Sequence, residues 1–211
     1  MLHKIIVEHQ AANGRADQAM HQRLCETIKR LQSDNQLAWP EYLCKSLHIL
    51  PFFHDNRSPY ADPNLRGAIL GLTMEGGITE LAKLYYATIL ALAYNDKAII
   101  DTMNACGHQI ETVIVTGGMT QNPLLMAASA NAIGLPIIVP QQTESVLLGC
   151  AISAKIAKTG EPYMAVMRAM SQAKEIIQPN QDPDLINFHD QKYQVFLTLK
   201  QQQDTINAMM K

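Results

Sequence analysis

The chain has 211 residues, of which 47% are hydrophobic and 17% are charged, and this balance excludes intrinsic disorder as the overall state. Seventeen basic and nineteen acidic side chains give a net charge of −2, which lacks the basic surplus that a nucleic-acid-binding protein needs. No apolar run approaches the ~20 residues that cross a bilayer, and Met1–His9 lacks the apolar core of a signal peptide, so we expect a cytoplasmic protein.

Residues 1–46 are expected to form a helical lead-in. An apolar period of 3.6 residues over 3–32 is interrupted at Asn13-Gly14. Residues 47–77 then combine an apolar run with a proline-rich loop and a short strand or turn over 67–72. Each proline biases the residue before it toward extended geometry, so we expect no helix in that loop.

Residues 78–106 predict one unusually long helix that carries apolar residues on most of its sides. Gly107 follows it, where a left-handed C-terminal cap is expected. One predicted face of the helix consists of Ile78, Leu81, Leu84, Tyr85, Thr88, Leu92, Ile99 and Met103.

Residues 112–160 alternate between strand and helix signals. At this spacing we expect two parallel strands joined by a right-handed crossover. The expected elements are a strand at 112–115, a helix that starts at Asn122-Pro123, a strand at 136–139 and a helix at 146–158 with Ser145 as its cap. Residues 161–211 are expected to form C-terminal helices, the last of them over 190–210.

The four cysteines are scattered without a CxxC pair, and the seven histidines form no HExxH pair. Structural zinc sites bring such ligands close together in the sequence, and disulfide scaffolds are smaller and richer in cysteine. The sequence therefore predicts reduced thiols and no metal site made by this chain.

The turn Gly117-Gly118, between the first predicted strand and its following helix, is the sharpest candidate for a ligand site. Glycines lack a Cβ, so another molecule can approach the backbone closely. Amides at a helix N-terminus then favour an anion such as a phosphate. The side chain of Asn122 could hydrogen-bond a ribose or a base, or only cap its helix. A tight turn without any ligand explains the same residues.

The loop from His54 to Gly67 is the second candidate. Its polar side chains include Asp55, Asn56, Arg57 and Asp62. These groups could bind a polar ligand or take part in catalysis. Asx side chains near prolines also build turns by bonding their own backbone, so a purely structural role stays open.

Several of these segments together resemble the FGGY family of carbohydrate kinases. The similar segments are the loop Phe53–Pro59 with Asp62-Pro63 and Arg66-Gly67, the adenosine motif Thr116-Gly117-Gly118 with Asn122-Pro123, the helix start Glu144–Ala151, and the terminal Tyr193–Phe196. The ordered set runs nearly from end to end and most resembles the pentulose kinase branch that includes D-ribulokinase. One departure is Leu90, which stands about where the family usually carries an acidic or amide residue.

The resemblance implies an α/β fold, namely the C-terminal domain of an actin-like (ribonuclease H-like) ATPase without its first strands. It implies the nucleotide-binding half of a kinase that transfers the γ-phosphoryl group of ATP to a hydroxyl of a pentulose or a related sugar or polyol. Gly117, Gly118 and Asn122 are then the nucleotide contacts. Magnesium, most sugar contacts and the general base depend on an N-terminal domain, so no catalytic residue is expected here.

The same comparison implies that the chain is inactive alone. The alternative is a non-catalytic remnant that acts as a binding or assembly module. With early strands missing, one edge of the sheet is expected to lie open near apolar surface from the long helix, which favours pairing with another chain. The expected partners are ATP or ADP, a sugar, a second copy of the chain, or a separately encoded N-terminal half, and neither nucleic acid nor membrane.

Overall fold

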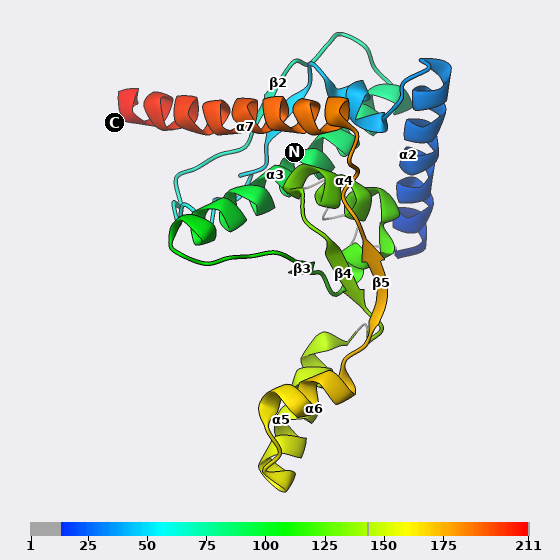
Figure 1. Cartoon of the computed structure of the whole chain (residues 1–211). Helices are drawn as coiled ribbons and strands as arrows, with labels where there is room; N and C mark the ends of the chain where they lie inside the picture. The colour runs from blue at the N-terminus through cyan, green and yellow to red at the C-terminus, as the bar shows by residue number, and fades with distance from the viewer. Residues whose placement is uncertain (1–13, 143, 211) are drawn as a thin grey trace.

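The computed structural model describes residues 14–142 and 144–210 (Figure 1). The part of the expected helix over 3–32 that precedes residue 14, with the break at Asn13, lies outside the described residues. The elements in chain order are α2 (Gly14–Asp34), η1 (Pro40–Cys44), β1 (His48–Leu50), β2 (Ala68–Leu70), α3 (Ile78–Ala105), β3 (Val113–Ile114), η2 (Gly118–Gln121), α4 (Pro123–Ile133), β4 (Ile137–Pro140), α5 (Ser145–Thr159), α6 (Tyr163–Met170), β5 (Ala173–Ile177) and α7 (Pro183–Met209). Over these two ranges we find no helix with the length and apolarity to span a membrane.

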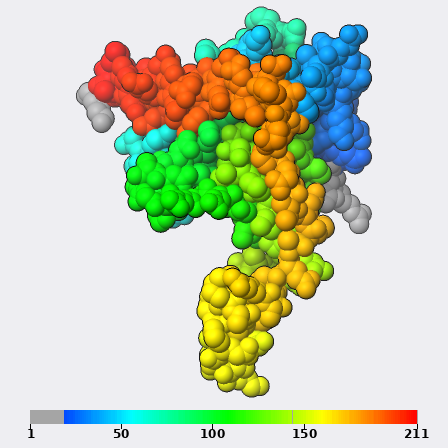
Figure 2. Space-filling model, in the orientation of Figure 1, coloured from blue at the N-terminus to red at the C-terminus, as the bar shows by residue number. Residues whose placement is uncertain are grey.

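Most elements pack into one body, from which the α5–α6 hairpin projects (Figures 1 and 2). α7 lies along one side of the body and α2 stands at its end. In the hairpin, α5 packs against α6 and buries only Ile152 among its residues. Val146 and Leu147 in its first turn are therefore 78% and 66% exposed.

Helix α3 is the centre of the hydrophobic core. It packs against α2, α4, α7 and β1, which explains why it carries apolar residues on most of its sides. The face that the sequence predicted is only partly in the core. Its first half, Ile78, Leu81, Leu84 and Tyr85, packs half-buried against the core, but Leu92 and Met103 are 41% and 40% exposed while Tyr86 and Leu90, outside that face, are 1% exposed. With neighbours on several sides, the apolar residues of α3 follow no single helical period, so the period could not select the deepest face.

β3, β4 and β5 form a sheet in that order. β3 and β4 are parallel, with Val113 opposite Ile137, as the strand–helix–strand spacing predicts. β5 pairs with β4 in the antiparallel direction, which corrects the expectation of helices alone after residue 160. The segment of β5 reads Ala-Lys-Glu-Ile-Ile, without apolar alternation, and most of it is exposed, so it carries no local strand signal. A separate antiparallel pair, β1 and β2, supplies the strand expected within 47–77.

The boundaries of two later helices differ from the expected ones. Ser145 is not the cap of α5: the N-cap position is Glu144, which makes no capping bond, and Ser145 is already helical. α7 begins at Pro183, well before residue 190, because the side chain of Asp182 accepts hydrogen bonds from the first-turn N–H groups. Asp182-Pro183 is itself a start signal, a cap followed by a first-turn proline.

A buried lysine fastens α7 to the segment around β1. Nζ of Lys192 donates to the carbonyl oxygens of Cys44 and Leu47 at 2.8 and 2.7 Å, and contacts Nδ1 of His48 at 3.0 Å. These partners use all three donors of the ammonium group. The lysine is 6% exposed, and burial lowers its pKa to about 8. Burial, and then the nearby ammonium, lower the pKa of His48 to about 4, so its ring is neutral and accepts the bond.

Candidate functional site

The turn between β3 and α4 is shaped by Gly117. Its φ of 85° and ψ of −163° lie in a region that only glycine adopts readily. The carbonyl oxygen of Gly117 accepts bonds from the N–H of Thr120 at 3.2 Å and from its Oγ1 at 2.8 Å, which closes the turn. A Cβ on Gly118 would meet no atom within 4 Å, and its φ is not positive. The chain's own structure thus requires glycine at 117 but not at 118.

Asn122 fixes the start of α4. Its Oδ1 accepts hydrogen bonds from the N–H groups of Leu124 and Leu125 at 3.1 and 3.2 Å. Its Nδ2 donates to the hydroxyl of Tyr85 on α3 at 2.9 Å, and burial raises the pKa of that tyrosine. The residue is 9% exposed. The capping role that the sequence offered is therefore present, and the side-chain amide keeps one N–H for a further partner.

The ends of two strands and the starts of two helices meet at this turn. β3 and β4 run in the same direction, so α4 and α5 begin at the same end of the sheet. Oγ of Ser145 donates to Oγ1 of Thr116 at 3.0 Å, which ties the first residue of α5 to the end of β3. The positive ends of two helix dipoles therefore lie at the same end of the sheet as the exposed glycine backbone. This combination favours an anionic ligand.

The loop over 54–67 is held largely by its own polar groups. Asn56 is 5% exposed, accepts a bond from the N–H of Tyr60 at 3.0 Å, and donates to Oδ1 of Asn95 on α3 at 3.1 Å. Oδ1 of Asp62 accepts a bond from the N–H of Asn64 at 2.8 Å. Both side chains therefore have the turn-building role that the sequence left open.

Asp55 and Arg57, in contrast, line an open cavity of about 330 Å³ beside the side of α3 that carries Leu92 and Asn95. A carboxylate and a guanidinium at one cavity could hold a polar ligand. The cavity lies at the loop over 54–67, and none of the residues that line it belongs to the glycine turn. The structure therefore does not bring the two sequence candidates together through a direct contact.

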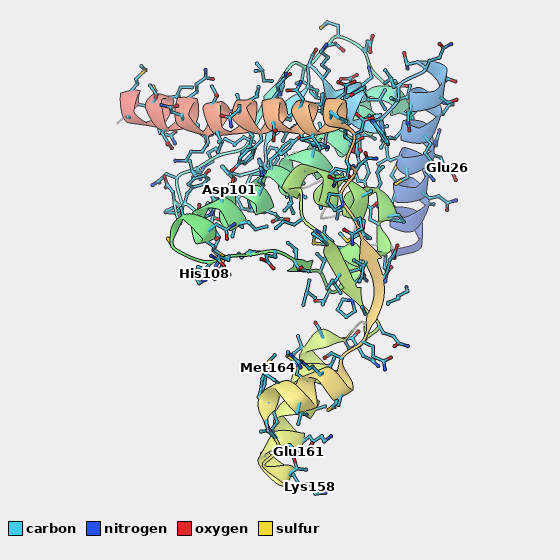
Figure 3. The ribbon with its side chains drawn as sticks, viewed as in Figure 1. Glu26, Asp101, His108, Lys158, Glu161 and Met164 are labelled. Carbon is cyan, nitrogen blue, oxygen red and sulfur yellow. The ribbon has the colours of Figure 1, made fainter. Side chains whose placement is uncertain are left out.

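Acidic and histidine side chains are dispersed over the molecule (Figure 3). Glu26 lies on α2, Asp101 and His108 lie at and just beyond the last turns of α3, and Glu161 lies at the far end of the projecting hairpin. In the part of the chain that the structure describes, no three His, Cys, Asp or Glu residues are placed to hold a metal ion.

Two contacts at the turn were missed by reasoning from the sequence. Tyr85 and Asn122 are 37 positions apart, and Ser145 and Thr116 are 29 apart. The only signal at Ser145 was its place before a helix, which indicates a cap. Tyr85 stood on the predicted apolar face of the long helix, where nothing distinguished its hydroxyl.

Comparison with known proteins shows which family the chain resembles. Residues 3–158 match the model of the FGGY family of carbohydrate kinases, C-terminal domain. An FGGY carbohydrate kinase domain-containing protein of Xenopus laevis is 40% identical over 170 residues, which cover 80% of this chain and 30% of that protein. A D-ribulokinase of Saccharomyces cerevisiae is 36% identical over 138 residues, which cover 63% of this chain and 19% of that protein.

Solved structures show the same fold. A xylulose kinase from Rhodospirillum rubrum matches with a TM-score of 0.70 at 19% identity, over 96% of this chain and 37% of that one. A glycerol kinase from Plasmodium falciparum, solved with ADP, matches with a TM-score of 0.60 at 16% identity, over 83% of this chain and 36% of that one. These matches confirm the expected α/β, actin-like ATPase fold.

The chain spans less than a third of the length of the curated relatives described above. The family model that residues 3–158 match describes the C-terminal domain of the family. The matched residues include both sequence candidates, the loop over 54–67 and the glycine turn. The chain belongs to the FGGY family of carbohydrate kinases, and what it carries is the C-terminal domain of that family.

Proposed function

We propose that this chain is the nucleotide-binding C-terminal part of an ATP-dependent sugar kinase. The observation that carries the proposal is the open turn at Gly117-Gly118. Nothing in the described part of the chain requires glycine at 118, whereas a ligand that lies against the backbone does require it. The nucleotide is supported by the ADP in the glycerol kinase structure. A pentulose or a related sugar or polyol as phosphoryl acceptor is supported by the D-ribulokinase relative.

In this proposal the backbone N–H groups at Gly117 and Gly118 bind the nucleotide. Asn122 positions them, because its bonds to the first turn of α4 and to Tyr85 fix the turn against α3. Its remaining amide N–H is available to the ribose or the base. The helix N-termini at this end of the sheet favour the negative charge of the phosphates.

The rest of the reaction needs groups that this chain does not provide. Phosphoryl transfer depends on positioning and on charge stabilisation by metal ions and donors around the transferred group. The described residues contain no metal-binding cluster, and none was matched to the general base of the family. We therefore propose that an N-terminal region, in the same polypeptide or separately encoded, supplies the base, the sugar contacts and part of the Mg²⁺ coordination, and that the reaction takes place in the cytoplasm.

Replacing Gly118 by valine is expected to remove nucleotide binding while leaving the chain folded. The space around a Cβ at this position is open, so the side chain fits the folded chain but occupies the volume assigned to the nucleotide. In an NMR titration, an ATP analogue should weakly shift the amide resonances of Gly117 and Gly118 in the parent chain. In the variant, it should hardly shift the amide resonances of the turn at all. Thr205→Val, at an exposed position of α7, is the matched control. Equal binding by the Gly118→Val variant would show that the assignment is wrong.

The purified chain, given ATP, magnesium and a panel of pentuloses and polyols, is expected to release no ADP above a control without enzyme. The physical reason is that the proposed general base lies outside the chain and only one side of the nucleotide is contacted. A coupled ADP assay measures this directly. Sugar-dependent ADP release by the chain alone would refute the proposed division of roles, whether or not the nucleotide binds at the turn.

A second candidate function is a binding or assembly module that retains the fold without catalysis. The observation in its favour is that β3, within residues 14–142 and 144–210, pairs with another strand on one side only. The two functions differ in what accompanies the chain. An upstream reading frame that encodes a DxGT loop and a GxxD motif would favour the kinase, and its absence would favour the module.

A further inference from the structure

Tyr85 reaches from α3 to the side chain of Asn122 at the start of α4. Its hydroxyl oxygen accepts a hydrogen bond from Nδ2 of Asn122 at 2.9 Å. Of the three residues assigned to the nucleotide, Gly117, Gly118 and Asn122, the last is the one with a polar side chain. Tyr85 therefore acts on the group that sets what the site offers besides its backbone.

The two ends of the Asn122 amide have separate tasks. Oδ1 lies on the side of α4, because it accepts bonds from the N–H groups of Leu124 and Leu125 at 3.1 and 3.2 Å. Nδ2 lies on the other side, and Tyr85 uses one of its two N–H groups. Within residues 14–142 and 144–210 the second N–H has no hydrogen-bond partner. Because the amide group is planar, the bond to Tyr85 also sets the direction of this second N–H.

Tyr85 is itself held from the side of α2. The ring of His21 meets the tyrosine ring edge-on, with 5.5 Å between the ring centroids and 85° between the planes, which is a favourable arrangement of two rings. Burial raises the pKa of Tyr85, so the hydroxyl keeps its proton at neutral pH and stays an uncharged acceptor. Side chains of α2, α3 and α4 thus converge on the amide of Asn122.

We infer that Tyr85 is a positioning residue of the nucleotide site, whose hydroxyl turns the second N–H of the Asn122 amide toward an acceptor atom of the nucleoside. The inference rests on the proposed function, and it adds a residue that does not itself touch the nucleotide. Because the group that Tyr85 presents is a donor, its partner is a ring nitrogen or a ribose oxygen. The exocyclic amino group of adenine, which is a donor, does not fit there.

Tyr85→Phe tests this role, because it keeps the ring and its contact with His21 and removes the hydroxyl. Without ligand, the amide resonances of Gly117 and Gly118 should stay near their parent positions, since Oδ1 of Asn122 still caps α4. The dissociation constant of an ATP analogue, from NMR titration well below every melting temperature, should rise about 2- to 10-fold, the range that one neutral hydrogen bond accounts for. Tyr163→Phe, at a 56% exposed position of α6, is the matched control and should bind as the parent does.

A double-mutant cycle shows whether Tyr85 acts through Asn122. Asn122→Ser keeps a capping oxygen but removes the amide, so it should also weaken binding. Adding Tyr85→Phe to Asn122→Ser should then leave the dissociation constant unchanged. Equal affinity of the parent and Tyr85→Phe, or effects that multiply in the double variant, would overturn the inference. Displaced resonances of the ligand-free turn in Tyr85→Phe would also overturn it, because the tyrosine would then merely support the fold.

Failure of the proposed function would look different. If the ATP analogue shifted neither Gly117 nor Gly118 in the parent chain, the nucleotide assignment would be wrong, and the role of Tyr85 would be lost with it. The hydrogen bond itself would remain measurable in that case. The effects of Tyr85→Phe and Asn122→Ser on the free energy of unfolding should be non-additive whether or not a nucleotide binds.

Discussion

Replacing Gly71 by alanine is expected to destabilise the folded chain by about 3 kcal/mol or more, since a left-handed backbone alone costs up to about that much. Gly71 follows β2 and has a φ of 92°, and a Cβ built on it would lie 1.8 Å from the carbonyl oxygen of Ser46. That oxygen belongs to the backbone just before β1, which pairs with β2 and packs against α3 and α7. Relief of the clash would therefore move the hairpin away from the core.

Gly76→Ala is the matched control for this substitution. Gly76 has no positive φ, and a Cβ there would meet no atom within 4 Å. The free energy of unfolding of the Gly76→Ala variant should therefore stay within about 0.5 kcal/mol of the parent value. Urea unfolding followed by circular dichroism measures both variants. If Gly71→Ala unfolded at the same urea concentration as Gly76→Ala, the close approach of β2 to the segment before β1 would be wrong.

Raising the pH from about 8 to about 10.5 is expected to increase the free energy of unfolding through Lys192. Burial lowers the pKa of this lysine from its usual 10.5 to about 8 in the folded chain. Between these values the unfolded chain binds more protons than the folded chain, so stability rises with pH. Below pH 8 both states carry the proton, and the folded state bears the cost of burying the charge. The difference between the two pKa values corresponds to about 3 kcal/mol.

Lys192→Met isolates this effect from the other groups that titrate in the same range. The variant leaves the carbonyl oxygens of Cys44 and Leu47 without their donor, so its free energy of unfolding differs from that of the parent at every pH. The test is the slope, because only the parent carries the titrating ammonium. Unfolding free energies of both proteins at several pH values between 7 and 11 give the difference curve. A flat difference curve would contradict the burial of the charge.

Much of the segment 112–160 was determined by the sequence itself. The β-branched residues at 112–115 and the start signal Asn122-Pro123 act over a few residues, through backbone geometry and capping. The structure confirms the parallel pair β3–β4 and the start of α4 at Pro123, capped by Asn122. The ordered motifs also identified the family. The choice of Gly117, Gly118 and Asn122 as nucleotide contacts remains a prediction.

Tertiary structure decided which of these groups have partners. It selected Tyr86 and Leu90 rather than Leu92 as the deepest residues of α3, and it added β5 to the sheet although that segment has no strand pattern. It also placed the side-chain amide of Asn122 where it donates a hydrogen bond to the hydroxyl of Tyr85. Periodicity records only that a residue is apolar or polar at a given spacing. Burial and hydrogen bonding depend on which distant segments pack together, and that information is spread over the whole chain.

Buried polar groups show most clearly the difference between what local sequence patterns determine and what tertiary packing determines. Glu41, Tyr94 and His189 are each at most 3% exposed, and they come from η1, α3 and α7. The hydroxyl of Tyr94 lies 3.0 Å from Nδ1 of His189, whose Nε2 lies 3.8 Å from the Glu41 carboxylate. In the sequence each looks like an ordinary surface or loop residue. Three elements bring these atoms together and give the Tyr94 hydroxyl its partner on His189, whereas Nε2 of His189 and Oε2 of Glu41 have no hydrogen bond among the described residues. Burying such a group costs free energy, so the packing of these elements, and no local pattern, decided where they lie.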